Sequence, residues 1–260
     1  MYAYLIDDWV YDRPHKKNRD RLDLLLTQQG ITGRTIKLGR LSDAKRDIIN
    51  AIESGVRTLV AVGNDTTVSK VLNSFMQVVR TADYKQYAQN TSLGTIPFGN
   101  PCIIAQSLGF PKTETAITAL ATRRARWIDL GCLNKRHYFI STALFPEQSV
   151  FSFGAYKMSS LERKHVIALC NSATPVSALA HSAVDPSDGR LDAVIAHEGS
   201  ARRWSTAREY FCDTCIPVSR ITITHPNKAV IVHADREKTL STPIEARIEP
   251  RGVLFVCKQT

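Results

Sequence analysis

The chain has 260 residues, of which 43% are hydrophobic and 22% charged, which is enough apolar material for one large domain or two modest ones. Its apolar runs are shorter than the roughly 20 residues that cross a bilayer, and its first segment carries acids where a signal peptide would carry lysines. Six cysteines in a chain of this length do not indicate a disulfide framework. We therefore expect a globular protein of the cytoplasm.

The first half of the chain alternates between short apolar runs and amphipathic segments. The pattern predicts strands at 2–10, 34–38, 58–62 and from residue 93, and helices at 16–30, from Ser42 as the cap to Glu53, from Asp65, and up to Gly109. Strands that alternate with helices predict a parallel sheet with helices on its faces. Such sheets bind ligands at the carboxyl ends of their strands.

From about Trp127 the pattern changes to short apolar runs that are separated by turn residues. These runs lie at 137–144, 166–169, 191–197, 219–224, 229–233, 244–248 and 253–256. They are typical of an antiparallel β domain. We therefore predict an α/β protein with a doubly wound N-terminal domain of residues 1–126 and a β-rich antiparallel second domain of residues 127–260.

The formal net charge of +10 points to anionic partners. Basic residues are concentrated at 15–19, 34–46, 123–126 and 202–203. A phosphorylated substrate, an anionic membrane surface and a nucleic acid all fit this charge, as does a basic face that contacts only solvent. The sequence contains no recognised nucleic-acid-binding module, so we expect no nucleic-acid partner.

Two loops are candidates for binding phosphate. The first, Gly63–Thr67, lies between the third strand and its helix, where unpaired helix amides and the helix dipole favour an anion. Asp65 could there face a nucleotide or its magnesium, although a purely structural turn is equally compatible with the spacing. The second, Pro97–Asn100, follows the fourth strand in the same way.

Five segments, in order, carry a resemblance to a known family: Gly63–Thr67, Pro97–Asn100, Trp127–Gly131, Asp185–Asp192 and Asp235–Glu237. They resemble the catalytic domain of the diacylglycerol kinase and sphingosine kinase type, especially its soluble bacterial lipid kinases. The first two are similar to the family's GGDGT and proline-leucine-glycine-threonine loops. The last two are similar to its acidic turn and its aspartate-glycine-glutamate segment.

The resemblance implies an α/β nucleotide domain of the NAD kinase and diacylglycerol kinase kind, a β-rich lipid domain, and a cleft between them. ATP would lie against Gly63, Asn64, Asp65, Thr66, Thr67, Pro97, Gly99 and Asn100. Asp65 would help to hold the nucleotide and its Mg²⁺, and Glu237 would take the proton from the attacking hydroxyl. Asp185, Asp188 and the carbonyl of Leu191 would hold a structural Mg²⁺, which prefers oxygen ligands.

The implied activity is transfer of the γ-phosphoryl group of ATP to a lipid hydroxyl such as that of diacylglycerol, by an enzyme peripherally attached to anionic membranes. A homodimer is a further expectation. The alternative is a catalytically weak or inactive relative that binds a lipid or a nucleotide, and NAD kinase chemistry is a third, smaller possibility. For single residues, a type I′ turn at Asp188-Gly189 and an exposed strand end at Glu237 are the structural alternatives.

The chain departs from the family's loops at several positions. Asn64 and Thr66 replace two glycines, and Thr66 would carry a strain of roughly 1–3 kcal/mol if its φ had to be positive. Pro101 replaces a third glycine and offers no amide to a phosphate. The acids at positions 7 and 8 would repel a phosphate group unless a magnesium ion lay between the carboxylates and the phosphate.

Cys212 and Cys215 have the spacing of half a zinc site or of a redox pair. The sequence offers only scattered histidines to complete such a site, at positions 181, 197, 225 and 233. We therefore expect both cysteines to be packing or loop residues.

Overall fold

The computed structural model describes residues 1–260 except 40–42, 161–164, 173–184, 199–209, 228 and 258–260. The chain divides into two compact units, one of Met1–Ile128 with Val253–Thr260 and the other of Asp129–Gly252. The predicted α/β fold, with a parallel sheet and a separate antiparallel sheet, is confirmed. The division differs from the predicted one at the C-terminus, because residue 253 and those after it return to the first unit.

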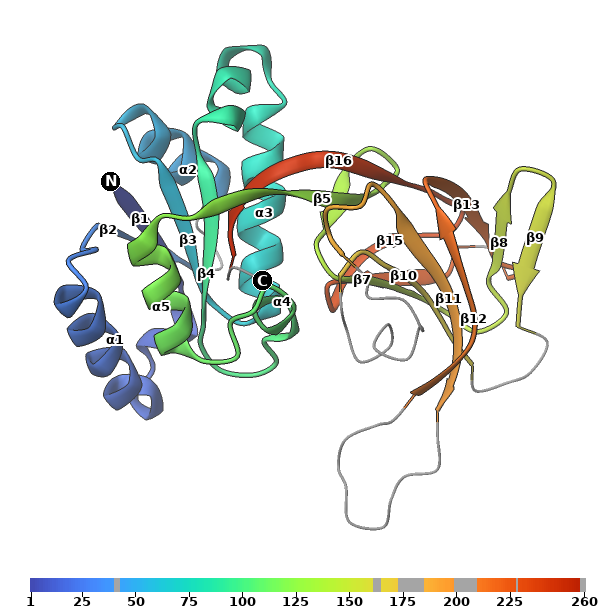
Figure 1. The fold of residues 1–260 in the computed structure, drawn as a ribbon, viewed down its shortest axis with the longest axis horizontal. Coiled ribbons are helices and arrows are strands. Elements are labelled where there is room, and N and C mark those ends of the chain that lie inside the picture. Colours follow the sequence, from blue (N-terminus) through green and yellow to red (C-terminus); the bar gives the residue numbers. More distant parts are fainter. Residues whose placement is uncertain (40–42, 161–164, 173–184, 199–209, 228, 258–260) are drawn as a thin grey trace, which may run out of the picture. The chain divides into compact units, whose positions relative to one another are not determined.

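The first unit is built on four parallel strands in the order β2-β1-β3-β4. They are β1 (Tyr2–Asp7), β2 (Arg34–Leu38), β3 (Thr58–Gly63) and β4 (Ser92–Pro97). The helices are α1 (Lys16–Gln28), α2 (Ala44–Glu53), α3 (Asp65–Val79), α4 (Ile103–Ser107) and α5 (Thr113–Thr122). Helix α1 packs beside α5, and α2 packs beside α3 (Figure 1).

Local sequence explains these elements. Leu59–Val62 of β3 is buried from both sides, as a central parallel strand requires, and α3 turns an apolar face that includes Leu72 and Phe75 toward the sheet. Helix α2 is capped by Asp43, whose carboxylate accepts the amides of two residues in its first turn. The predicted cap, Ser42, lies outside the described residues.

The second unit contains a six-stranded antiparallel sheet in the order β12-β11-β10-β7-β14-β15. Its strands are β7 (Thr142–Phe145), β10 (His165–Cys170), β11 (Leu191–Glu198), β12 (Tyr210–Val218), β14 (Ile231–Ala234) and β15 (Glu237–Ser241). The remaining strands are β5 (Ala125–Leu133), β6 (His137–Phe139), β8 (Val150–Phe153), β9 (Tyr156–Ser159), β13 (Arg220–Thr224) and β16 (Ile244–Val256). One apolar core joins residues of both groups.

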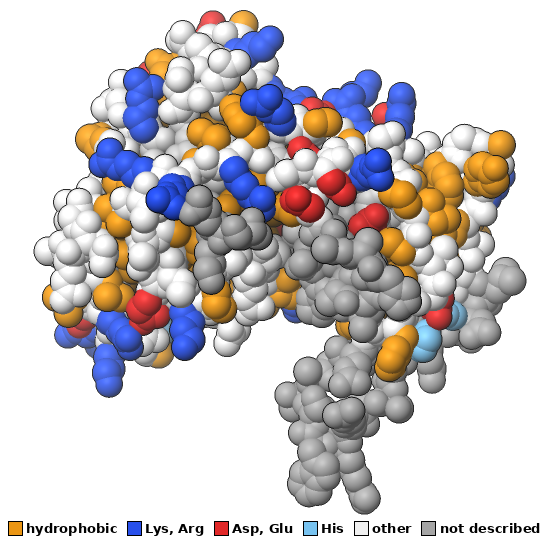
Figure 2. Space-filling view, viewed as in Figure 1, with side chains coloured by type: hydrophobic (Ala, Val, Ile, Leu, Met, Phe, Trp, Pro, Cys, Tyr) orange, Lys and Arg blue, Asp and Glu red, His pale blue; other side chains and the backbone are white. Residues whose placement is uncertain are grey.

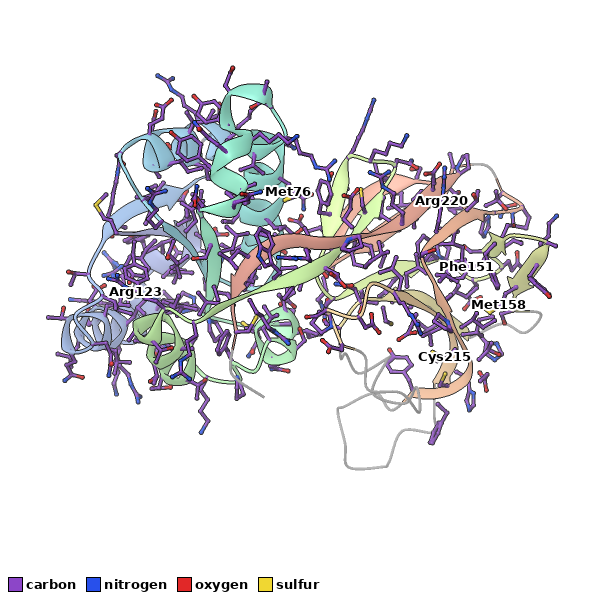
Figure 3. The ribbon with its side chains drawn as sticks, turned by 45° about the horizontal axis from the view of Figure 1, so that its top comes forward. Met76, Arg123, Phe151, Met158, Cys215 and Arg220 are labelled. Atoms are coloured by element: carbon purple, nitrogen blue, oxygen red, sulfur yellow. The ribbon has the colours of Figure 1, made fainter. Side chains whose placement is uncertain are left out.

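Phe151 shows how this core is made. Its side chain is fully buried, and it pairs across the β8–β9 hairpin with Met158, which packs partly buried against the same core (Figure 3). Among the described residues, no helix combines the length and the apolar character that a membrane span requires.

Three boundaries differ from the sequence prediction. The first strand ends at Asp7, and a 3₁₀ turn follows over Asp8–Tyr11. The predicted strand at 137–144 is two strands, β6 and β7. The predicted strands at 244–248 and 253–256 are one strand, β16, whose Phe255 pairs with Leu93 of β4.

Candidate functional site

The corner between β3 and α3 is the first predicted phosphate loop. Asn64 is the N-cap of α3, and its side-chain oxygen accepts a hydrogen bond from the amide of Thr67 (3.3 Å). The backbone of Asn64 is extended (φ −92°, ψ −171°), and Thr66 lies in the first turn of the helix. Neither residue has a positive φ, so the strain considered for Thr66 does not arise.

Gly63 is required here for a reason of space. A Cβ atom at this position would overlap the side chain of Thr67. The Thr67 hydroxyl donates a hydrogen bond to a carboxylate oxygen of Asp7, at the end of β1 (2.8 Å). The strand order reverses between β1 and β3, because β2 lies on one side of β1 and β3 lies on the other. Open α/β sheets bind ligands at such a point. Gly63 thus allows Thr67 to join the two strand ends at that point.

Asp65 connects the two predicted loops. Its side chain is buried, and its carboxylate oxygens accept hydrogen bonds from the amides of Ile103 (3.0 Å) and Ile104 (2.9 Å). These amides belong to the first turn of α4, where a helix leaves its amides unpaired. The Asp65 amide in turn donates to the carbonyl of Pro101 (3.1 Å). Asp65 therefore fastens the first loop to the second.

The second loop, Pro97–Asn100, lies directly beside the first. The amide of Phe98 donates to the carbonyl of Gly63 (2.9 Å). Gly99 has a φ of +76°, and the ring of Trp9 occupies the space that a Cβ atom would take. Both the backbone conformation and the lack of space therefore favour glycine at this position. Asn100 is exposed, and its side chain is therefore accessible to a ligand.

Packing also fixes the second loop. The ring of Trp9 lies against those of His15 and Phe98, with centroids 5.2 and 5.7 Å away. The Cys102 sulfur lies 3.2 Å from the carbonyl oxygen of Gly99. Burial raises the pKa of the Cys102 thiol to about 11, so it stays protonated at neutral pH and can donate to this carbonyl.

A cavity of about 290 Å³ lies in the first unit, bordered by α1, the second loop and the start of α5. Pro97, Gly99 and Asn100 line it, whereas no residue of Gly63–Thr67 does. Arg21 and Glu114 form an ion pair on its wall (2.7 Å). Its volume is near the lower end of small-molecule sites, about 300 Å³. Of the two predicted loops, only the second borders this cavity.

In the second unit, Asp235 and Arg236 form the two-residue turn between β14 and β15. Their φ values of +47° and +70° are those of a type I′ hairpin turn, although Arg236 stands where the family has glycine. Glu237, the predicted proton acceptor, follows as the first residue of β15 and is half-buried.

Asp235 holds a neighbouring segment of the second unit. Its buried carboxylate accepts the amides of Ile140 (2.7 Å), Ser141 (2.9 Å) and Thr142 (3.2 Å), and also the Ser141 hydroxyl (2.7 Å). Burial raises the pKa of Asp235, and these hydrogen bonds oppose the rise because they favour the carboxylate. Asp235 is therefore a structural anchor for the segment between β6 and β7.

The two predicted magnesium carboxylates, those of Asp185 and Asp188, lie in one exposed turn. The carboxylates of Asp185 and Asp188 each accept the amide two residues further along (3.1 and 3.0 Å), and Leu191 begins β11. Gly189 alone of the Asp188-Gly189 pair has a positive φ, so the turn is not type I′. Burial raises the pKa of nearby Asp192, and the charge of Asp188 raises it further. A cation would relieve this repulsion.

Asp129 is the residue that sequence reasoning missed. It is buried, and its carboxylate accepts the amides of Gly189 and Arg251 (both 2.7 Å), while its own amide donates to Pro186 (2.6 Å). It thus fixes the acidic turn to β5. An acid inside an otherwise apolar strand was the available signal, since a buried carboxylate must find donors.

Cys212 and Cys215 lie against an apolar cluster that includes Val194 and Ala196, as expected for packing residues. Among the described residues, the group of His, Cys, Asp and Glu side chains spaced to share a metal ion does not include either thiol. Of the features named above, His181 and the basic pair at 202–203 lie outside the described residues.

Comparison with known proteins finds a likeness in the first part of the chain. Residues 13–133 match the sequence model of the diacylglycerol kinase catalytic domain. The likeness is to the catalytic domain of that family, and it extends over less than half of the chain. A Yersinia enterocolitica protein named "Probable lipid kinase YegS-like" is 29% identical over 119 residues, and a Yersinia pestis protein of the same name is 33% identical over 102 residues. These matches cover 45% and 39% of this chain but only 38% and 32% of the relatives.

The fold of the whole chain is that of solved diacylglycerol kinase structures. The structure of a diacylglycerol kinase from Bacillus anthracis superposes with a TM-score of 0.71, covering 99% of this chain and 97% of that one at 12% identity. A second structure from the same organism gives the same TM-score and coverage at 14% identity. At these identities the likeness shows the fold, and both units take part in it.

Proposed function

We propose that the protein is a lipid kinase that transfers the γ-phosphoryl group of ATP to a lipid hydroxyl such as that of diacylglycerol. The observation that carries the proposal is the link made by Asp65, which holds two family loops together at adjacent strand ends. Phosphoryl transfer depends mainly on positioning and on neutralising charge, so a fixed pair of loops is what the reaction needs from this part of the protein.

The nucleotide side of the site is proposed to lie at the ends of β3 and β4. The N-terminus of α3 would attract phosphate through its dipole, and Gly63–Thr67 and Pro97–Asn100 would contact the nucleotide. Because the Asp65 carboxylate already binds two amides and is buried, we assign it the shaping of these loops. The Mg²⁺ that accompanies ATP would supply the charge neutralisation that the reaction requires.

Glu237 is the proposed proton acceptor for the lipid hydroxyl, by its match to the family's acidic segment. The acidic turn is the proposed site of a structural Mg²⁺, with Asp185, Asp188 and the Leu191 carbonyl as ligands. Its residues fit such an ion because they offer only oxygen donors, and because Asp188 adds negative charge beside Asp192.

One observation favours the alternative of a weakly active or inactive relative. The Asn64 side chain already accepts the Thr67 amide, one of the donors that a phosphate would use at the start of α3. A phosphate at this corner would therefore have to replace or share the hydrogen bond.

The first experiment measures binding and the second measures transfer. Saturating MgATP, at 100 times its dissociation constant, is expected to add roughly 2.7 kcal/mol to the free energy of unfolding. Transfer of labelled phosphate to diacylglycerol in mixed micelles then tests catalysis. A MgATP shift without transfer to any lipid hydroxyl would favour the alternative, and absence of both would overturn the kinase proposal.

Glu237→Gln is expected to lower the transfer rate by roughly 100-fold or more, since a general base contributes about that much, without changing the MgATP shift. Glu53→Gln is the control, because Glu53 lies at the end of α2 and contacts Tyr84. A Glu237→Gln protein with full transfer rate would disprove the proposed role of Glu237.

Peripheral membrane binding and a homodimer are parts of the same proposal. The net charge of +10 supports attraction to anionic lipid, although Lys and Arg side chains are scattered over the visible face of the first unit (Figure 2). Sedimentation with anionic and neutral vesicles tests membrane binding. Light scattering of the protein as it elutes from a gel-filtration column tests the homodimer. Binding that is equal for both vesicle types would contradict an electrostatic attachment.

A further inference from the structure

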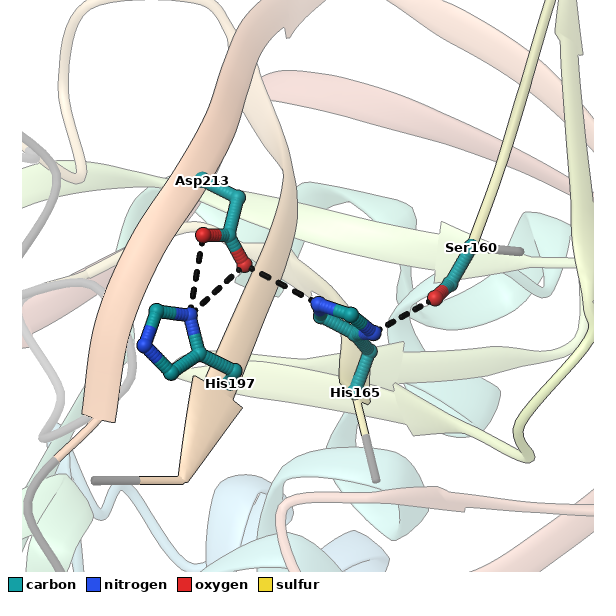
Figure 4. Close-up of polar contacts among 4 residues, drawn as sticks. All are labelled: Ser160, His165, His197 and Asp213. Carbon is teal, nitrogen blue, oxygen red and sulfur yellow. Dashed lines mark hydrogen bonds and ion pairs between the residues drawn. The ribbon is translucent and has the colours of Figure 1, made fainter. Parts of the chain in front are cut away.

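Three adjacent strands of the second unit bring two histidines and an aspartate together at one end of the sheet (Figure 4). His165 of β10 pairs directly with His197 of β11, and Asp213 lies on β12 next to them. The Nδ1 atom of His197 is 2.9 and 3.0 Å from the two carboxylate oxygens of Asp213, and Nε2 of His165 is 3.3 Å from one of them.

A β-bulge aims the aspartate at the histidines. Ile195 pairs with Thr214 and Ala196 pairs with Cys212, so Asp213 is an extra residue on β12. The bulge frees its side chain from the regular alternation of the strand, a common way of directing a side chain at a site. Cys212 packs instead with the apolar cluster of Ala196, so the donor set is two imidazoles and one carboxylate.

Ser160 can form a hydrogen bond with either tautomer of the His165 ring. Its hydroxyl lies 2.7 Å from Nδ1 of His165. A hydroxyl can donate or accept, so it serves both tautomers of the ring. With Nδ1 protonated and donating to Ser160, the lone pair of Nε2 faces the Asp213 carboxylate and is available to a metal ion. With the other tautomer, Nε2 donates a hydrogen bond to that carboxylate.

We propose that His165, His197 and Asp213 bind one divalent transition-metal ion of the Zn²⁺ class, independently of the kinase proposal. Tetrahedral Zn²⁺ with bonds of about 2.0–2.2 Å places neighbouring donors roughly 3.3 Å apart. The imidazole nitrogens lie 2.9–3.3 Å from the carboxylate oxygens, and the three ligand atoms all lie within 4.8 Å of one another. Imidazole selects this class of metal over Mg²⁺ and Ca²⁺, which prefer oxygen. The side chains of His197 and Asp213 are 47% and 37% exposed, which leaves room for a water ligand.

The ion would join the ends of β10, β11 and β12. Histidine side chains reach the visible surface of the second unit beside an acidic side chain (Figure 2), so a metal can enter from solvent. The ring of Phe211 stacks on that of His197 (5.5 Å between centroids), which helps to fix the ligand before metal arrives. Such an ion would stabilise the folded unit by mass action.

The test is titration of the full chain, freed of metal, with ZnCl₂ at neutral pH in the calorimeter, together with thermal unfolding. We expect one Zn²⁺ per chain, a higher melting temperature, and no competition from millimolar Mg²⁺. His197→Gln and Asp213→Asn should each weaken binding at least 10-fold, and Ser160→Ala should weaken it by about 10-fold as a partner of a ligand does. Unchanged affinity in Asp213→Asn, or no binding by the parent protein, would overturn the site.

Two controls separate this site from other zinc-binding groups. His225→Gln removes a histidine whose ring nitrogens lie by the carbonyl oxygens of Glu147 and Asn227, and it should bind Zn²⁺ as the parent does. The double variant Cys212→Ser, Cys215→Ser should also keep full affinity. Loss of binding in the cysteine variant alone would assign the metal to the thiols and disprove the proposal.

Discussion

Asp65 in the first unit and Asp235 in the second are both acids of family-like segments, and both are buried side chains that accept backbone amides from another segment. They differ in how many donors they hold. Among the hydrogen bonds between described residues, Asp65 accepts two amides, whereas Asp235 accepts three amides and a hydroxyl. The comparison teaches that an acid in a family-like segment can act by shaping a loop, and that its contribution to stability should follow the number of donors it satisfies.

The largest effect is expected for Asp235→Ala. The change leaves three amides and the hydroxyl of Ser141 buried without an acceptor, at a cost of about 4 kcal/mol in the free energy of unfolding. Urea denaturation measures it. Ser141→Ala, which removes one of the four hydrogen bonds, should cost only about 1 kcal/mol. Equal losses in the two variants would break the proposed link between donor count and stability.

Asp65→Ala is expected to cost less, about 2–3 kcal/mol, because two amides at the start of α4 lose their acceptor. Thr66→Ala, at an exposed neighbouring position, should change stability by less than about 0.5 kcal/mol. Thr66→Gly should be less stable than Thr66→Ala by roughly 0.5–1 kcal/mol, since this residue is helical and gains nothing from glycine. A gain in stability from Thr66→Gly would show that the loop favours a backbone conformation that only glycine adopts without strain.

Much of the first unit could be predicted from the sequence because its signals are local. Buried runs such as Leu59–Val62 and the periodic apolar residues of α3 are contiguous in the chain, so the alternation of strands and helices is evident. The candidate loops were found for the same reason. The roles of their acids were not, because the donors to Asp65 lie 38 and 39 residues away.

The second unit was less predictable because its decisive contacts are distant in sequence. Asp129 binds amides 60 and 122 residues further along, and no spacing rule links such positions. The runs at 244–248 and 253–256 were predicted as separate strands, whereas β16 is continuous, and its pairing partners come from other parts of the chain. The bulge at Asp213 depends on how β11 and β12 pair, which residue types alone do not fix.

A smaller effect is expected for His137, a half-buried residue whose Nε2 atom is shielded from solvent. Burial lowers the pKa of His137 to about 4, and its Nε2 has no hydrogen-bond partner among the described residues. The unfolded chain binds a proton near pH 6.5 and the folded chain does not, so stability falls as the pH drops from about 6.5 toward 4. His137→Gln should remove up to about 2 kcal/mol of this fall.

The free energy of unfolding is measured against pH for the parent protein and for His137→Gln. The difference between the two profiles isolates His137, because the other titrating groups cancel. Parallel profiles for the parent and His137→Gln would mean that this ring is as well solvated in the folded chain as in the unfolded one.

The smallest effect is expected where charges meet in solvent, at the ion pair of Arg21 and Glu114 beside the cavity. Its side chains are 68% and 42% exposed, so water screens the attraction and the double-mutant coupling of Arg21→Ala and Glu114→Ala should be only about 0.2–1 kcal/mol. Raising the salt concentration should reduce it further. A coupling energy above 2 kcal/mol would show that an exposed ion pair in a cavity wall can stabilise the protein as much as a buried carboxylate does. It would contradict the ranking of stability effects by the number of buried donors that Asp65 and Asp235 satisfy.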